Sequence, residues 1–198
     1  MSYQIVAISR QFGSGGRTVG KELAEKLGVP CYDAEIVEKT AQETHLAPTF
    51  IKEEGEYAAN GSKLFGMLAG RDINGHSYQD DVWNAQRKVI LELAEKGPCV
   101  IVGRCADYIL KDRGDCLRVF IHADMETRAK RIVEKYGERD DAPEKRLKDK
   151  DKRRAAYYYF YTDSEWGAAE NYDLSLNAGT LGIDQCVQTL YRLCKDGQ

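Results

Sequence analysis

Ile5 to Lys21 read IVAISRQFGSGGRTVGK, and the architecture of the chain follows from this segment more than from any other. An apolar, β-branched run ends there in a glycine-rich turn, and the turn opens onto a segment with apolar residues at helical spacing. Glycines let the backbone fold back so that several N–H groups point into one hollow, and the dipole of a following helix adds positive potential. The order of strand, glycine-rich loop and helix therefore predicts a site for a nucleotide or another phosphate ester.

The loop departs from the standard phosphate-binding pattern G-x-x-x-x-G-K-[ST], in which a lysine reaches the outer phosphates. In one register Arg17 replaces that lysine and Gln11 replaces the leading glycine. In the other register Gly16 stands at the lysine position and Arg17 follows it. Both registers place the cation of Arg17 in the first turn of the helix, where a guanidinium can bind phosphate through two N–H groups.

Two other interpretations of this loop stay open. Gly13-x-Gly15 followed by Asp33 resembles the G-x-G-x-x-G pattern of dinucleotide-binding folds with its ribose-binding acid. Thr18 stands where the third glycine of that pattern belongs, and only Gly20 could then allow close packing of helix on strand. The second alternative is a glycine-rich turn with a purely structural purpose.

Composition and charge fit a single intracellular enzyme domain covering residues 1–198. The chain is long enough for a proper core, and its net charge of −3 gives no indication of nucleic-acid binding. Its six cysteines form no C-x-x-C pair and are expected to be free thiols. No signal peptide and no apolar run of membrane length is recognised. We expect a cytoplasmic protein that binds neither nucleic acid nor a membrane, and the sequence predicts no oligomeric state.

Segments of strand and helix character alternate along the chain, which favours a parallel sheet between two layers of helices. The expected strands cover residues 3–8, 30–33, 99–103, 117–122 and 172–176. The expected helices cover residues 17–27, 34–44, 81–96, 124–136, 143–162 and 183–195, with a short helix after residue 103. In sheets of this kind a ligand binds beyond the carboxyl ends of the strands.

Charged residues stand at several of those strand ends. Asp33 ends the second expected strand, and Arg104 directly follows the third. The fourth strand leads into a helix that carries Arg128 and Arg131, and a run rich in lysine and arginine covers residues 145–154. Phosphoryl transfer depends on positioning and on positive charge around the transferred group, so this distribution favours that chemistry. For any single cation, a solvated surface position is the alternative.

Taken in order, these segments resemble the cytidylate kinase-like proteins, relatives of bacterial cytidylate kinase among the P-loop nucleoside monophosphate kinases. The resemblance runs nearly end to end and rests on Ile8–Arg17, Leu27-Gly28, Tyr32-Asp33, Val102–Arg104, Val119–Ile121 with Arg128 and Arg131, Asp151-x-Arg153 and Tyr172–Leu174. It implies a three-layer α/β fold of the P-loop NTPase type with five parallel strands, a helical substrate-binding insertion near residues 45–80 and a closing lid near residues 137–156. It also implies transfer of the γ-phosphoryl group of ATP, with Mg²⁺, to a nucleoside monophosphate or a similar small phosphorylated acceptor.

The resemblance also assigns roles to individual residues. The acceptor is expected to lie in one pocket with Asp33, Lys39 and Arg104. Thr18 is expected to direct its hydroxyl toward Mg²⁺. The donor phosphates are expected to lie against Arg10, Gly13, Ser14, Gly15, Gly16, Arg17 and Thr18. The cations expected to act in catalysis are Arg17, Arg128, Arg131, Lys150 and Arg153, with Arg153 as the principal lid residue.

The chain departs from the family pattern at positions that matter for catalysis. The loop lysine is absent, and an Asp-Gly-Arg-Asp run is here residues 102–105, Val-Gly-Arg-Cys, so that both acids are missing. Asp107 follows closely and is a candidate to approach magnesium instead. Beyond Asp33, a serine and an arginine are replaced by Ala34 and Lys39. The alternative function is therefore a nucleotide-binding sensor or regulator with little or no catalysis.

Overall fold

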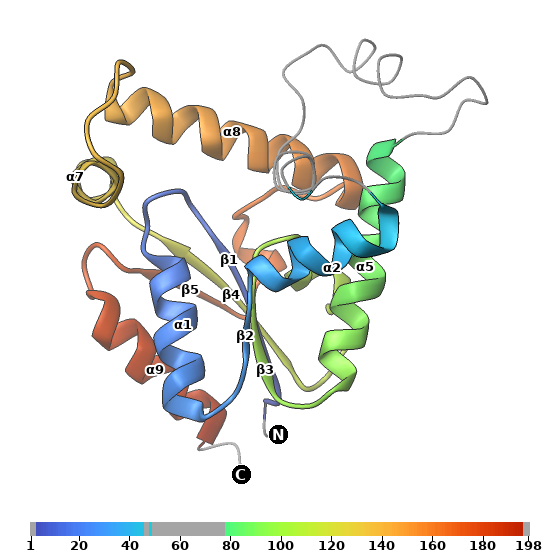
Figure 1. Cartoon of the computed structure of the whole chain (residues 1–198). Coiled ribbons are helices and arrows are strands. Elements are labelled where there is room, and N and C mark those ends of the chain that lie inside the picture. Colours follow the sequence, from blue (N-terminus) through green and yellow to red (C-terminus); the bar gives the residue numbers. More distant parts are fainter. Residues whose placement is uncertain (1–2, 46–47, 49–77, 196–198) are drawn as a thin grey trace.

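A computed structural model describes residues 3–45, 48 and 78–195. In these residues five parallel strands form one sheet in the order β2-β3-β1-β4-β5 (Figure 1). Since β1 lies between β3 and β4, the segments that follow these three strands emerge side by side at one edge of the sheet. The strands are β1 (Ile5–Arg10), β2 (Cys31–Tyr32), β3 (Cys99–Val102), β4 (Cys116–His122) and β5 (Leu174–Asn177).

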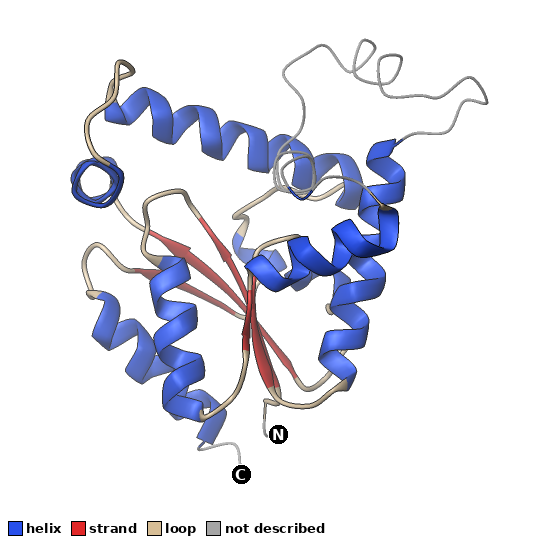
Figure 2. Ribbon diagram, viewed as in Figure 1, coloured by secondary structure: helices blue, strands red, loops and turns tan. Residues whose placement is uncertain are grey.

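Helices cover both faces of the sheet, as Figure 2 shows. One face carries α1 (Gly16–Leu27) and α9 (Ile183–Lys195). The other face carries α2 (Ala34–Thr44), α5 (Tyr78–Glu95) and the short α6 (Ala106–Ile109). In the part of the chain that the structure describes, no helix combines the length and the apolar character needed to span a bilayer.

The sequence of β1 explains the two layers. Val6 and Ile8 point into the core beneath α1 and α9, whereas Ile5 and Ala7 point into the core beneath α2 and α5. Successive side chains of a strand alternate between the two faces, so a strand covered on both sides must be apolar throughout. The continuous apolar run before the glycine-rich loop is therefore the signature of a central strand.

A third group of elements closes the edge at which the strands end. α7 (Met125–Tyr136) packs against α8 (Pro143–Thr162), and Ile132 and Leu147 are fully buried between them. Phe12 from the glycine-rich loop packs on this cluster. In Figure 1, α8 runs across the edge of the sheet beyond the carboxyl end of β1.

The expected element order is confirmed, and α2, α8 and α9 have the expected bounds. Gly28 ends α1 in a left-handed conformation, with φ of 71°. β5 begins at Leu174 and not at residue 172, because the N–H of Tyr172 closes a 3₁₀ turn over Ala169–Asn171. The insertion expected near residues 45–80 lies almost entirely outside the described residues.

The cysteines are free thiols, as expected. Burial raises the pKa of the Cys116 thiol to about 12 and that of Cys99 to about 11. Both side chains lie in the core next to strand residues, where the neutral thiol acts as a small apolar group.

Candidate active site

The glycine-rich loop joins β1 to α1, and left-handed glycines give it its shape. Gly13 and Gly15 have φ of 76° and 90°, a region that side chains disfavour. A Cβ at Gly13 would lie 2.9 Å from Cγ2 of Ile132 and 3.0 Å from the carbonyl oxygen of Arg128. No side chain therefore fits between the loop and α7. No side chain caps α1 at Gly15, so the N-terminus of this helix suits an anion.

Ser14 contributes to the interior of the loop. Its side chain is fully buried, and its hydroxyl donates to the carbonyl oxygen of Gln11 at 2.9 Å. The same hydroxyl accepts a long hydrogen bond of 3.4 Å from the N–H of Gly16. Ser14 therefore holds the turn in shape, and a ligand would meet the backbone of the loop and not this hydroxyl.

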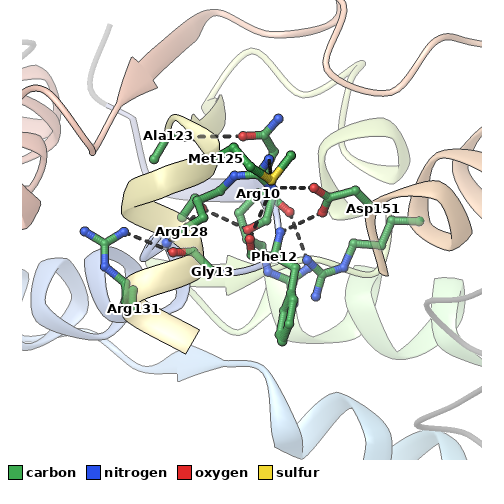
Figure 3. Close-up of polar contacts among 12 residues, drawn as sticks. Arg10, Phe12, Gly13, Ala123, Met125, Arg128, Arg131 and Asp151 are labelled. Atoms are coloured by element: carbon green, nitrogen blue, oxygen red, sulfur yellow. Dashed lines mark hydrogen bonds and ion pairs between the residues drawn. The ribbon is translucent and has the colours of Figure 1, made fainter. Parts of the chain in front are cut away.

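Arginine side chains from α7 and α8 bind the carbonyl oxygens of the loop (Figure 3). Figure 3 shows two of these side chains, Arg128 and Arg131, reaching the loop from α7. The contacts fix the loop from outside and surround it with positive charge. The nitrogen-to-oxygen distances are 3.2 Å from Arg154 to Arg10, 3.3 Å from Arg128 to Phe12 and 3.1 Å from Arg131 to Gly13.

Asp151, on α8, joins the arginines that hold the loop; we call these residues together the frame of the loop. Its carboxylate accepts from the backbone N–H of Phe12 at 2.7 Å and pairs with the guanidinium of Arg128 at 2.5 Å. Arg128 is only 5% exposed, so Asp151 neutralises a charge that would otherwise be buried without a partner. One carboxylate thus ties both helices to the loop.

A small pocket lies beside the loop, at the carboxyl ends of β1 and β3. Its charged residues in the described part of the chain are all arginines: Arg10, Arg104 and Arg154. Three arginines give the wall of this pocket a positive character that suits an anion, and aromatic side chains add flat apolar surface. The remaining lining residues are Ser9, Gly103, Cys105, Tyr157, Tyr158 and Trp166.

The turn after β3 places Arg104 at this pocket, and the backbone of this turn has an uncommon conformation. Gly103, Arg104 and Cys105 all have left-handed φ values of 80°, 60° and 53°. For the two residues with side chains this conformation is strained, and such strain is concentrated at functional sites. Gln86, fully buried on α5, lies 3.5 Å from the carbonyl oxygen of Arg104 and 3.4 Å from the hydroxyl of Tyr157. Gln86 therefore supports both residues from behind.

Asp107 belongs to a buried group of hydroxyls behind the pocket. Burial raises the pKa of its carboxyl to about 6, against an opposing hydrogen bond from Tyr158. Tyr158 also contacts Tyr172, which bonds Ser9 in turn. The idea that Asp107 approaches magnesium finds no support in this placement, since only 2% of the residue is exposed.

Of the three expected acceptor residues, only Arg104 is among the described residues that line the pocket above. Asp33 instead forms an ion pair with Arg17, and Lys39 lies 3.6 Å from Glu35 on the same helix. Arg17 is thereby directed to the end of β2, whereas Thr18 stays partly buried in the first turn of α1.

In the charged run of α8, the arginine that points toward the loop is Arg154 and not Arg153, which was the one expected. Arg154 is buried and reaches the loop, whereas Arg153 and Lys150 are only partly buried. The inward stripe of α8 also contains Leu147, Asp151 and Tyr158, which have the spacing of one helical face. Arg128 and Arg131 both contact the loop, and their catalytic role stays a prediction.

Comparisons with known proteins agree with this architecture. The cytidylate kinase of Archaeoglobus fulgidus is 28% identical over 94% of this chain and 92% of its own length. An uncharacterized protein from Eubacterium ventriosum has a solved structure with a TM-score of 0.72 and 28% identity, covering 98% of this chain and 99% of that one. The shikimate kinase of Acinetobacter baumannii, solved with shikimate, shares the fold at a TM-score of 0.57 and 18% identity, with 99% and 95% covered. The model of the cytidylate kinase-like family matches residues 5–180, and the chain therefore belongs to that family.

Proposed function

We propose that the protein transfers the γ-phosphoryl group of ATP to a nucleoside monophosphate or a similar small phosphorylated acceptor. Membership of the cytidylate kinase-like family supports a nucleotide kinase in general terms. The observation that carries the proposal is the pairing of two anion sites, the glycine-rich loop and the arginine-lined pocket. Arg10 and Arg154 border both, because each lines the pocket and each takes part in a loop contact.

The loop suits the phosphates of ATP. A side chain at Gly13 would clash with α7, and the loop ends at the N-terminus of α1, where the N-cap residue Gly15 has no side chain. Thr18 in the first turn offers a hydroxyl oxygen, the kind of ligand that Mg²⁺ accepts alongside phosphate oxygens. When bound, Mg²⁺ would neutralise part of the phosphate charge. Arg131 adds positive charge from the α7 side of the loop, whereas Arg128, whose charge is balanced by Asp151, holds the carbonyl oxygen of Phe12.

The pocket suits the phosphate of the acceptor. Arg104 and Arg154 would hold its oxygens, since both residues line the pocket and no carboxylate is among its described lining residues. An acceptor oxygen forms the new bond to the γ-phosphorus as the bond to the β–γ bridging oxygen breaks, and ADP leaves with that oxygen. The flat faces of Tyr157 and Trp166 would bear on the rest of the acceptor.

The site leaves a second function to be tested, binding of a nucleotide without turnover. The loop has no lysine, and the first-turn cation Arg17 is paired with Asp33. A loop with this pairing favours a sensor or regulator if no other cation acts on the transferred group. We keep residues 137–156 as the proposed lid and the cytoplasm as the proposed location.

An acceptor panel separates the two functions. Purified protein is incubated with ATP, Mg²⁺ and each of several nucleoside monophosphates and sugar phosphates, and ADP formation is followed. We expect ADP above the acceptor-free rate with at least one phosphorylated acceptor. ATP binding without turnover on any acceptor would favour the sensor, and binding of NAD(P) without binding of ATP would defeat both functions.

A further inference from the structure

We propose that Arg10 supplies the positive charge that the loop lysine supplies in a standard P-loop, and that residue 16 is glycine because the stem of Arg10 occupies its side-chain space. The inference rests on the proposed kinase function, since it assigns a residue to the transferred phosphoryl group. It selects the register in which Gly16 stands at the lysine position.

The space around Gly16 leaves no room for a side chain. A Cβ built there would lie 2.6 Å from Cβ of Arg10 and 3.0 Å from Cγ of Arg10. It would also lie 3.1 Å from Cβ of Ile121, on the neighbouring strand β4. The side chain of Arg10 therefore starts in the volume that a lysine at position 16 would need. The two side chains are mutually exclusive in this backbone.

The backbone gives no other reason for glycine at this position. Gly16 is absent from the glycines with positive φ, in contrast to Gly13 and Gly15 on either side of Ser14. It is the first residue of α1, and glycine is less favourable than alanine in a helix. The close approach of Arg10 accounts for a glycine that conformation does not require.

Arg10 also stands where such a cation is needed. It is the last residue of β1, at the start of the loop, and its own carbonyl oxygen is held by Arg154 at 3.2 Å. Arg10 and Arg104 are both among the residues that line the pocket. A charge in that position lies between the loop and the proposed acceptor site, which is the path of a group transferred from one to the other.

Arg17, the cation favoured by the sequence, has a different environment. Its side chain is 49% exposed and forms an ion pair with Asp33. Solvent screens a half-exposed guanidinium more strongly than a partly buried one such as Arg10, so Arg17 would stabilise a phosphoryl group less. The two arginines therefore make opposite predictions for mutagenesis.

The first test is Arg10→Met, which keeps an unbranched stem next to Gly16 and removes the charge. We expect kcat to fall by roughly 10- to 150-fold, the loss of one charge-assisted contact to phosphate. Arg10→Lys should retain more activity than Arg10→Met. Arg192→Ala, at an exposed position in the last turn of α9, is the matched control and should leave kcat within twofold.

The second test moves the cation to the other position. Gly16→Lys alone should be impaired, because the new side chain meets Arg10. In Arg10→Gly/Gly16→Lys the Cβ of residue 10 is gone as well, which removes the closest contact, and we expect kcat at least tenfold above that of Arg10→Gly. A double variant no better than Arg10→Gly would overturn the proposal. An Arg10→Met protein within threefold of the wild type would also overturn it, as would a larger loss of kcat from Arg17→Ala than from Arg10→Met.

The readouts separate this inference from the proposed function. ATP affinity of each variant is measured by calorimetry, and folding is checked by thermal denaturation. A wild-type protein that turns over no acceptor defeats the kinase proposal itself. A wild-type protein that turns over an acceptor, with folded Arg10→Met equally active, defeats only the role of Arg10.

Discussion

Two turns follow the neighbouring strands β1 and β3, and they use the left-handed conformation in different ways. After β1 the residues with positive φ are glycines, Gly13 and Gly15, so that the loop presents its backbone. After β3 the conformation continues through Arg104 and Cys105, which carry side chains. The turn after β3 therefore has strained residues whose side chains can contact a ligand. The loop after β1 avoids this strain with glycines, because its backbone is the binding surface.

The two turns also differ in how they are supported. The loop after β1 is bound by arginines on three of its carbonyl oxygens and by the carboxylate of Asp151. The turn after β3 is supported by Gln86 through contacts of 3.4–3.5 Å, close to the limit of a hydrogen bond. We infer a firmly held donor site next to an acceptor turn with weaker restraint.

Removing Asp151 should have the largest effect, because it takes away the frame that distinguishes the first turn. Asp151→Ala leaves Arg128 buried without its partner and frees the N–H of Phe12, and we expect a loss of about 3–4 kcal/mol in the free energy of unfolding. Urea denaturation measures it. Asp149→Ala, exposed on the same helix, is the control. Equal stabilities of the two variants would mean that the frame does not hold the loop.

Removing the side chain of Arg104 tests the second turn. For Arg104→Ala we expect kcat/KM for the acceptor to fall about 100-fold, within the ~1.5–3 kcal/mol of a charge-assisted hydrogen bond, while ATP affinity stays within threefold. Steady-state kinetics with varied acceptor and calorimetry with ATP measure the two effects. Arg87→Ala, exposed on α5, is the matched control. An equal loss of ATP affinity would contradict the assignment of ATP to the loop after β1 and of the acceptor to the turn after β3.

Asp107, behind the second turn, should give a smaller and pH-dependent effect. Its carboxyl has a pKa raised by burial from 3.8 to about 6. Between those values the folded protein holds a proton that the unfolded chain has released, so its contribution to stability falls as the pH rises from about 4 to 6 and is constant above. Asp107→Asn removes this dependence. We expect the free energy of unfolding of the variant, relative to that of the wild type, to rise by on the order of 2 kcal/mol from pH 4 to pH 8.

Denaturation at several pH values checks this prediction. Asp112→Asn, at an exposed position, is the control and should follow the wild-type profile. If Asp107→Asn has the same pH dependence of stability as the wild type, the carboxyl of Asp107 is hydrated in solution and the prediction is wrong.

The fold could be predicted because its signals are local. Apolar runs bounded by turns gave the strands, and helical periodicity with glycine at the ends gave the helices, as Gly28 and Gly137 illustrate. The phosphate loop could be predicted for the same reason, since strand, glycines and helix are contiguous. The order of the strands in the sheet was not predicted, because it depends on pairing between segments that are distant in the sequence.

The partners of the site residues could not be predicted, because they depend on contacts between distant segments. Arg17 was expected to face phosphate, and nothing local indicated its pairing with Asp33. Two features of the sequence pointed to site residues but were not used in the predictions. Gln86 is a polar residue on the apolar face of its helix, and Arg154 lies on the same helical stripe as Leu147.

The most direct measurement of the central claim is a crystal structure of the protein with a non-hydrolysable ATP analogue, Mg²⁺ and the best acceptor of the panel. The account predicts the β- and γ-phosphates on the backbone of Gly13 to Thr18, the acceptor phosphate between Arg104 and Arg154, and Arg10 between the two. A nucleotide bound away from this loop, or an acceptor phosphate outside the arginine-lined pocket, would contradict it.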